Sequence, residues 1–353
     1  MTLKNLRSQI DSIDRQIVRL LNTRARVTRN IMSTKRQEGK SIYSPEREQE
    51  VLRKISSINK GPLNSNALEA IYREIMSCSL AIGAPLRIAY LGPEATFTHL
   101  AALKKFGAQV EYIPGKSIAD VFLDVERDNA DYGVVPIENS IEGAVSHTMD
   151  MLVDSDLKIC AQIILDVSHN LLANHPKEKI KRVYSNPQVF GQCRIWLQEN
   201  LPAADMIEVS STTRAAQIAS KEKYGACIAS LLAAKVYKLK VVAKDIEDSP
   251  HNITRFLVIG KTDVPQTGKD KTSIMFSVKD RIGALHDMLL PFRKHSINLT
   301  KIESRPSKKK AWDYYFFVDL EGHRDNPKVK KALSELESRC TFLKILGSYP
   351  IGE

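Results

Sequence analysis

The sequence predicts a multidomain protein whose fold class changes twice along the chain. Residues 1–85 carry a seven-residue apolar repeat, which predicts an all-α helical bundle. In residues 86–264, short apolar strands alternate with helical stretches, which predicts an α/β domain. Residues 270–353 mix strands and helices in the order of a small α+β domain. A chain of 353 residues is long enough for these three domains.

The N-terminal segment predicts one long helix and two shorter ones. Two apolar rows run along a helix of about 35 residues, which needs other helices to cover its seam. The rows are Leu3, Ile10, Ile17 and Ile31, and Leu6, Ile13, Leu20 and Val27. We expect the partner helices near residues 45–58 and 65–82, and a second copy of the chain beside them, so that the protein is a homodimer or a larger homo-oligomer.

A cation interrupts the first apolar row at Arg24. Lys35 follows about three helical turns later, so both side chains leave nearly the same face of the helix. A cation on an apolar face is costly unless it meets an anion. Two explanations stay open. Either Arg24 pairs with a carboxylate of a neighbouring helix such as Glu48, or the bundle encloses an anionic ligand.

The central segment carries polar side chains where its strands end, at "YLGPEATFT", "YGVVPIENS" and "VYSNPQVFGQ". These stretches contain Thr96, Asn139, Ser185 and Gln192. Ligands of α/β proteins often bind beyond strand ends. Each stretch also has a plainer explanation, because Ser, Thr and Asn are common helix N-caps.

The stretch "SPHNITRFLVIG" places a hydroxyl and a fixed cation, Thr254 and Arg255, directly before an apolar run that predicts a buried strand. An edge strand with a polar entry is one explanation. A ligand site at the end of a sheet is the other.

The C-terminal segment predicts the βαββαβ order of a ferredoxin-like unit. A polar stretch at 260–271, with Gly and Pro, predicts a linker before it. The expected strands and helices are 272–278, 281–294, 297–304, 312–319, 327–338 and 342–349.

Composition narrows the function classes. The net charge is +11, and residues 1–85 hold 15 Lys and Arg against 8 Asp and Glu. Because these charges are scattered and lack an aromatic RNA-binding signature, they fit a small anionic substrate better than nucleic acid. The five cysteines form no CxxC pair, which favours a cytoplasmic protein without disulfides or a metal site. No apolar run of about 18 residues and no signal-peptide core occurs, so we expect no membrane association.

The N-terminal residues "LRSQID…LLNTRARVTRNIMSTKR…SPERE…IYREIMSCS" resemble the all-helical chorismate mutases, which are dimeric bundles. The resemblance implies a cavity for chorismate with Lys35 and Glu48 as catalytic residues. It also implies substrate contacts from Arg24, Arg47 and Ser79, and from Arg7 of the other subunit. Two positions depart from the family pattern: Ser44 replaces an Asp, and Gly83 replaces a Gln or Glu that meets the ether oxygen. A bundle kept for dimerisation alone is therefore the alternative.

The central segment, from "GPEATFT" to "TRF", resembles the prephenate dehydratases. The resemblance implies two α/β lobes like those of periplasmic binding proteins, which face each other across a cleft. Thr254 and Arg255 match the catalytic Thr-Arg-Phe element. The match implies Thr254 as hydrogen-bond donor to the leaving hydroxyl, and Arg255 either holding a carboxylate or lowering the electrostatic cost nearby. Thr96, Asn139, Ser185 and Gln192 are implied to bind prephenate. No cofactor is expected.

The C-terminal segment resembles the ACT domains, which bind amino acids at subunit interfaces. The stretch "GALHD", with Gly283, Ala284 and Leu285, and the stretch "ESRP", with Glu303, Ser304 and Arg305, imply L-phenylalanine as effector. The order of the three domains resembles the bifunctional chorismate mutase/prephenate dehydratases. A non-catalytic amino-acid sensor is a competing hypothesis, although a sensor has no need for a leaving-group donor such as Thr254.

Overall fold

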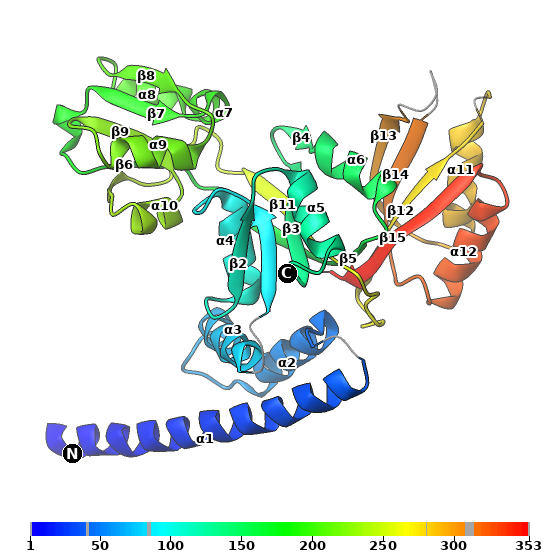
Figure 1. Cartoon of the computed structure of the whole chain (residues 1–353), viewed down its shortest axis with the longest axis horizontal. Coiled ribbons are helices and arrows are strands. Elements are labelled where there is room, and N and C mark those ends of the chain that lie inside the picture. Colours follow the sequence, from blue (N-terminus) through cyan, green and yellow to red (C-terminus); the bar gives the residue numbers. More distant parts are fainter. Residues whose placement is uncertain (1, 40–41, 83–85, 280, 308–313, 352–353) are drawn as a thin grey trace. The chain divides into compact units, whose positions relative to one another are not determined.

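A computed structural model describes residues 2–39, 42–82, 86–279, 281–307 and 314–351 (Figure 1). The chain forms two compact units. The first comprises Met1–Arg87 and Lys105–Glu111, and the second comprises Ile88–Lys104 and Tyr112–Glu353. Gly83, where a mutase side chain is expected to be missing, lies outside the described residues.

The first unit contains the three predicted helices, which are α1 (Leu3–Gln37), α2 (Pro45–Ile58) and α3 (Ser65–Ala81). Side-chain caps begin two of them: Thr2 accepts from Asn5 N at the start of α1, and Asn64 accepts from Ala67 N at the start of α3. Pro45 is the first residue of α2, where its missing N–H costs nothing.

Both apolar rows of α1 are exposed in the single chain. Leu3 is 66% exposed and Leu20 is 68% exposed, and Ile10, Ile13, Ile17, Val27 and Ile31 are also exposed. The helices α2 and α3 therefore cover only part of the seam, and most of its apolar surface is left for another partner.

The second unit begins with a first lobe built on a six-stranded sheet of order β2-β1-β3-β11-β5, with β4 paired to β3. The helices α5 and α6 pack against β3. The two longest interior strands, β3 and β11, run antiparallel, so that the end of β3 lies beside the start of β11. The elements are β1 (Arg87–Leu91), α4 (Phe97–Phe106), β2 (Glu111–Gly115), α5 (Ile118–Glu126), β3 (Tyr132–Asn139), β4 (Gly143–Ala144), α6 (Ser146–Asp154), β5 (Lys158–Asp166) and β11 (Ile253–Gly260).

A second lobe is built on a five-stranded sheet of order β10-β6-β9-β7-β8, which is visible with its helices in Figure 1. Alternate residues of its strands feed two cores: Leu172 and Cys227 pack with α9 and α10, and Leu171 and Ile228 pack with α7 and α8. The elements are β6 (Asn170–Ala173), a 3₁₀ turn (Lys177–Lys179), β7 (Arg182–Ser185), α7 (Pro187–Gln192), α8 (Arg194–Asn200), β8 (Asp205–Glu208), α9 (Thr212–Ala219), β9 (Gly225–Ala229), α10 (Leu231–Val236) and β10 (Lys240–Ala243).

The C-terminal residues form the predicted βαββαβ order, with an antiparallel C-terminal sheet of order β13-β14-β12-β15. The first helix begins at Ala284, later than expected, because Gly283 has a left-handed backbone (φ 77°) and forms its N-cap. The elements are β12 (Asp270–Ser277), α11 (Ala284–Lys294), β13 (Leu299–Pro306), β14 (Tyr314–Glu321), α12 (Pro327–Glu337) and β15 (Phe342–Pro350).

The two faces of the C-terminal sheet have different partners. Ile274 and Val318 pack beneath α11 and α12. Met275 and Phe317, which point the other way, share a core with residues of the first lobe. The central and C-terminal segments are therefore packed together as one compact unit, although each has its own sheet.

The contact between β15 and β5 depends on a glycine. A Cβ atom added to Gly347 would lie 2.3 Å from the backbone oxygen of Ile159 and 2.8 Å from its nitrogen. Since both atoms are backbone, the two strands would have to separate.

We expect Gly347→Ala to lower the free energy of unfolding by about 1–3 kcal/mol, the usual cost of overpacking. Gly191→Ala is the matched control, because Gly191 has open space around it and should be neutral or slightly stabilising. Denaturant melts of both variants check this. Equal midpoints for the two would show that β15 and β5 separate without cost.

Candidate active sites

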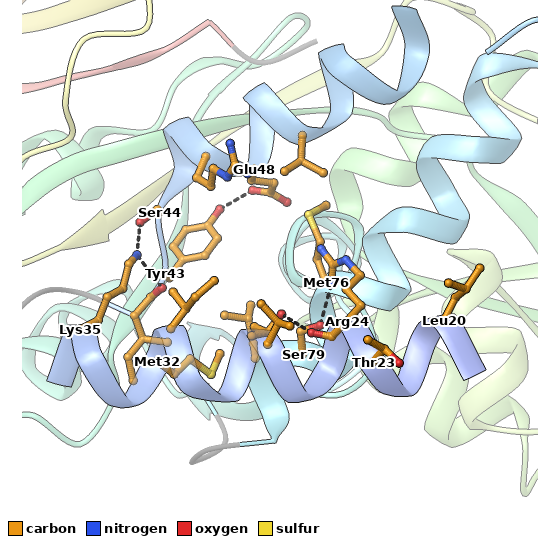
Figure 2. Close-up of a pocket in the computed structure, with 17 residues that line it drawn as sticks. Leu20, Thr23, Arg24, Met32, Lys35, Tyr43, Ser44, Glu48, Met76 and Ser79 are labelled. Atoms are coloured by element: carbon orange, nitrogen blue, oxygen red, sulfur yellow. Dashed lines mark hydrogen bonds between the residues drawn. The ribbon is translucent and has the colours of Figure 1, made fainter. Parts of the chain in front are cut away.

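The first unit contains an open cavity of about 590 Å³ lined by α1, α2, α3 and the segment before α2. Figure 2 shows Arg24 and Lys35 rising from α1 toward opposite ends of this cavity, with Glu48 of α2 across from them. Apolar side chains, including Met32, fill much of the wall between these charges. Such a space can hold a small anion whose negative groups lie at both ends.

Arg24 is held by α3. Its Nη1 donates to Ser79 Oγ at 2.9 Å, while Ser79 Oγ donates to the carbonyl of Ile75 at 2.7 Å (Figure 2). Because the hydroxyl hydrogen of Ser79 is donated to the carbonyl of Ile75, Ser79 orients Arg24 and does not donate to a ligand. Among the described residues, the guanidinium of Arg24 forms no ion pair with a carboxylate, so pairing with Glu48 is not the explanation for the cation in the seam.

Lys35 Nζ donates to Ser44 Oγ at 2.6 Å and to the carbonyl of Ile42 at 3.4 Å. Both acceptors are neutral, and within the described part of the chain no carboxylate forms an ion pair with Lys35. An Asp at position 44 would have neutralised part of the positive charge of Lys35.

Glu48 is already engaged. Its Oε2 accepts from Tyr43 Oη at 2.7 Å and pairs with Lys105 Nζ at 2.7 Å, inside the same compact unit. Arg47 lines the cavity and pairs with the exposed Glu50 at 2.6 Å. Arg7 is not among the lining residues of the cavity in its own chain.

A second group of polar side chains meets where β3 and β11 end in the first lobe. Thr254 and Asn139 are direct partners in the ladder, and Asn139 Nδ2 lies 2.7 Å from Thr254 Oγ1. The amide orientation is fixed because Asn139 Oδ1 accepts from the backbone N–H groups of Ile141 and Glu142. Asn139 is thus the donor and Thr254 the acceptor, which leaves the hydroxyl hydrogen of Thr254 free to be donated elsewhere.

This hydrogen-bond chain continues into the second lobe. Asn139 Nδ2 also donates to Asn252 Oδ1 at 2.8 Å, and Asn252 Nδ2 donates to Gln192 Oε1 at 2.9 Å. His169 Nε2 lies 2.7 Å from the same Gln192 oxygen and must therefore carry the hydrogen. The amide nitrogen of Gln192 is thereby turned toward Glu142, whose Oε1 accepts at 3.2 Å.

Asn252 and His169 were not predicted as site residues. Asn252 is 3% exposed and His169 is 1% exposed. The sequence did contain one signal, since Asn252 stands two residues before Thr254 and so shares its side of the strand. Nothing in the sequence around His169 marks it.

We expect the stability of the protein to fall on acidification because of His169. Burial lowers the pKa of His169, and this outweighs Gln192 and Glu247, which raise it. The unfolded chain therefore takes up this proton at a higher pH than the native protein does, so stability falls as pH drops below about 6.5. The loss amounts to about 1.4 kcal/mol for each unit by which the native pKa lies below the unfolded one.

His169→Gln keeps a donor near the Nε2 position without a titrating group, so its thermal midpoint should change less between pH 7 and pH 5 than that of the wild type. His99, whose pKa is also lowered by burial, remains in both proteins and cancels in the comparison. If the thermal midpoints of the two proteins fall equally between pH 7 and pH 5, His169 is not the cause of the loss of stability.

Two predicted substrate residues are placed differently from expectation. Ser185 is fully buried and donates its hydroxyl to the carbonyl of Ile228 at 3.1 Å, so it supports the sheet of the second lobe. Thr96 donates to the carbonyl of Leu91 and accepts from His99 N, which makes it a helix cap at the start of α4. Both hydroxyls are therefore engaged within the protein, and the binding of prephenate by these two residues stays a prediction.

The expected role of Arg255 also needs correction. Its side chain is 11% exposed, and its Nη1 lies 2.6 Å from Asp319 Oδ2, on the C-terminal sheet. Because successive residues of a strand point to opposite faces, Arg255 leaves β11 away from Thr254. A guanidinium whose charge is already taken by Asp319 does not hold a substrate carboxylate beside Thr254.

The expected effector residues lie in two places of the C-terminal domain. Gly283 caps α11. Of the next two residues, Ala284 is buried and Leu285 is partly exposed. Glu303, Ser304 and Arg305 lie on β13, an outer strand of the C-terminal sheet. Arg305 donates to Ser146 Oγ at 2.6 Å and to Asp150 Oδ1 at 2.9 Å, both on α6.

Comparisons with known families match the chain in three parts. Residues 6–83 match the family of chorismate mutase type II, residues 88–264 match prephenate dehydratase, and residues 272–338 match the ACT domain. These matches define the class of protein: a prephenate dehydratase domain between a chorismate mutase domain and an ACT domain.

Relatives of known name extend over the whole chain. A bifunctional chorismate mutase/prephenate dehydratase of Aquifex aeolicus is 51% identical, with 99% of this chain and 98% of the relative covered. One of the same description from Pseudomonas aeruginosa is 44% identical over 99% of this chain and 97% of the relative. The chain belongs to the family of bifunctional chorismate mutase/prephenate dehydratases.

A solved structure supports the fold of the second unit. The prephenate dehydratase of Arthrobacter aurescens in complex with L-Phe has a TM-score of 0.70 and 33% identity. The match covers 75% of this chain and 90% of that one. None of the described helices of this chain combines the length and the apolar character that a membrane span requires.

Proposed function

We propose that the two reactions of this family are carried out at the two groups of residues described above. The chain is a bifunctional enzyme of phenylalanine biosynthesis, which converts chorismate to prephenate and prephenate to phenylpyruvate. The first reaction is assigned to the cavity of the helical unit and the second to Thr254. The observation that carries the second assignment is the free hydroxyl hydrogen of Thr254, left available because Asn139 donates to the same oxygen.

In the dehydratase reaction the ring carboxylate of prephenate leaves as carbon dioxide. Its bonding electrons move through the ring, which becomes aromatic, and the hydroxyl at the opposite position leaves. That hydroxyl needs a hydrogen-bond donor as negative charge develops on it. Thr254 supplies the donor and Asn139 fixes its direction. A threonine hydroxyl is a weak acid, so its role is to stabilise and position the leaving group.

The amide of Gln192 binds a carboxylate of prephenate in this assignment. In the free protein the side chain of Glu142 accepts from this amide at 3.2 Å and, more weakly, from Gln188 at 3.4 Å. A substrate carboxylate would replace the carboxylate of Glu142 at the same donors. His169 and Asn252 hold the amide oxygen from behind, so the nitrogen is already turned toward the substrate.

The mutase reaction is a unimolecular rearrangement, so the cavity needs to hold a reactive conformer and stabilise charge on the ether oxygen. Arg24 binds a carboxylate with its planar fork, and Ser79 keeps that fork in place. Lys35, whose neighbours Ser44 and Ile42 are neutral, supplies the donor for the ether oxygen. Glu48 and Arg47 complete the side formed by α2.

The C-terminal domain is proposed to bind L-phenylalanine and to lower dehydratase activity. The amide groups at the start of α11, beyond Gly283, suit a carboxylate, and β13 supplies a second wall. Inhibition requires that phenylalanine bind two states of the protein with different affinity.

Calorimetry is expected to show phenylalanine binding to the intact protein, and Gly283→Val is expected to weaken that binding, because a β-branched residue strains the left-handed backbone at this position. Tyrosine serves as the control ligand. Absence of heat with phenylalanine would contradict the effector assignment.

The protein is proposed to be a cytoplasmic homodimer or larger homo-oligomer that needs neither metal nor cofactor and binds neither nucleic acid nor membranes. The exposed apolar rows of α1 support self-association, because a second copy would cover them and bring its Arg7 within reach of a cavity. The described cysteines form no disulfide, which is typical of proteins in a reducing compartment. Sedimentation at two protein concentrations tests the oligomeric state.

One experiment separates this function from its competitors. Purified protein is incubated with chorismate and with prephenate in separate reactions, and the product spectra are followed. We expect turnover of both substrates. Turnover of prephenate alone would favour a bundle kept for dimerisation, and turnover of neither would favour an amino-acid sensor.

A further inference from the structure

The strands β3 and β11, which carry Asn139 and Thr254, have a second face with charged side chains. Thr254 pairs with Asn139 in the ladder, and the next residues, Arg255 and Glu138, also pair with each other. Successive residues of a strand point to opposite faces. One face therefore carries the hydrogen-bonded Thr254 and Asn139, and the other carries a cation and an anion.

The charged face is held by the C-terminal sheet. Arg255 Nη1 lies 2.6 Å from Asp319 Oδ2 on β14, and its Nη2 donates to Tyr349 Oη on β15 at 2.9 Å. Ser273 on β12 contacts both Asp319 and Tyr349. Glu138 pairs with Lys301 Nζ on β13 at 2.9 Å. Side chains of β13, β14 and β15 thus contact the back of β3 and β11, and β12 supports two of them through Ser273.

The contacts of Arg255 with Asp319 and Tyr349 hold its side chain in one position. The side chain of Arg255 is 11% exposed and that of Asp319 is 9% exposed. Burial opposes the charge of Arg255, but Tyr349 and Asp319 outweigh it and raise the pKa of the guanidinium. Two separate nitrogens of the planar fork are engaged, which fixes direction as well as distance.

Regular strand pairing fixes this part of β11 on one side only, because its register against β5 is regular from Ile253 to Val258. The register of β11 against β3 shifts between Arg255 and Phe256, directly beside Thr254. Such irregularities re-aim side chains and loosen the local ladder. On the side of β3, the position of Thr254 then depends on what holds Arg255, and Arg255 is held by the C-terminal sheet.

The same sheet carries the proposed effector strand. Asp319 on β14 is the ladder partner of Lys301 on β13, and β13 continues to Glu303 and Arg305. Arg305 contacts Ser146, the first residue of α6, which follows the loop after Asn139. A shift of β13 on effector binding would therefore reach Asp319 through one pair of hydrogen-bonded strands.

We propose that Arg255 is a positioning residue: held by Asp319 and Tyr349, it sets the position of Thr254, and through it the C-terminal sheet controls the dehydratase site. The inference rests on the proposed function of Thr254 and adds the path of its regulation. Arg255 touches no substrate in this account. Its contribution appears in the rate of the chemical step and in the response to phenylalanine.

The test measures dehydratase kcat, KM for prephenate and inhibition by phenylalanine in the full chain. For Asp319→Asn we expect kcat to fall at least about tenfold, because small misplacement of a reacting group is costly, with KM changed by less than about threefold. The phenylalanine concentration for half inhibition should rise at least about fivefold. Arg255→Lys should retain more kcat than Arg255→Gln, because it keeps the charge.

Additional variants keep the test decisive if Asp319→Asn folds poorly. Tyr349→Phe removes one hydrogen bond and should lower kcat less than Asp319→Asn does. The double variant Arg255→Gln/Asp319→Asn should have a kcat no lower than that of the less active single variant, because both substitutions remove the same contact. Mutase activity of each variant reports on the integrity of the helical unit.

Lys344→Met is the matched control. Lys344 of β15 is another cation between the C-terminal sheet and the first lobe, and it donates to the carbonyls of Leu152, Val153 and Ser155 at the end of α6. Its loss should loosen the same packing without moving Thr254, so we expect kcat to change by less than about threefold.

Two results would overturn the inference. If Lys344→Met and Asp319→Asn lower kcat equally, in step with their melting temperatures, Arg255 has a structural role only. If Arg255→Gln raises KM strongly while Asp319→Asn does not, Arg255 contacts the substrate. Wild-type turnover of prephenate is measured first, and its absence would reject the assignment of the reaction itself, which is a different outcome from either of these.

Discussion

Replacing Thr254 by Ala is expected to reduce the conversion of prephenate to phenylpyruvate by about a hundredfold to a thousandfold. The lost hydroxyl is the donor to the leaving group, and removal of one such donor typically costs about 3–4 kcal/mol of barrier. The fold should persist, because the change removes a small group at the end of β11. Steady-state assays of kcat and KM for prephenate measure the effect.

Two matched variants separate the hydroxyl from the shape of the residue. Thr254→Ser keeps the hydroxyl that Asn139 orients and should keep most of the activity. Thr254→Val keeps the shape but not the hydroxyl, and should be as poor as Thr254→Ala. Near-normal phenylpyruvate formation by Thr254→Val would show that another group assists the leaving hydroxyl.

Replacing Arg24 by Leu is expected to reduce mutase activity by about a hundredfold or more, since truncating one partner of a desolvated charge pair costs about 2–5 kcal/mol. The substitution suits the site, because Arg24 interrupts an otherwise apolar row and leaves Ser79 with a second partner in Ile75. Chorismate disappearance measures the loss.

Arg24→Lys is the control for charge. It keeps a cation in the cavity but loses the fork, so its activity should lie between those of the wild type and Arg24→Leu. Dehydratase activity should be unaffected in both variants, because Arg24 and Thr254 belong to different compact units. Unchanged mutase activity in Arg24→Leu would place the chorismate site elsewhere.

The sequence was a good guide to elements with strong periodic patterns. The seven-residue rows predicted α1, and the βαββαβ order was confirmed in the C-terminal domain. Four strands of the central segment were missed, namely β2, β4, β6 and β8. The first and last of these, "EYIPG" and "DMIE", are short and polar because they form outer positions of their sheets, where apolar runs are not required.

The sequence was a poorer guide to the direction of individual side chains. It identified Thr254 and Arg255 together, but neighbouring residues of a strand face opposite ways, and only the structure shows which face meets which domain. Ser185 was selected for its hydroxyl, which any buried serine also has. His169 contributes through a contact with Gln192, 23 residues away, which no local pattern encodes.

The measurement that tests the account most directly is a chorismate assay of Thr254→Ala. The account assigns the two reactions to separate compact units, so this variant should consume chorismate at the wild-type rate and accumulate prephenate instead of phenylpyruvate. The wild type, assayed in parallel, should form phenylpyruvate. If the variant leaves chorismate unconsumed, or converts it to phenylpyruvate as fast as the wild type does, the assignment of one reaction to each site is wrong.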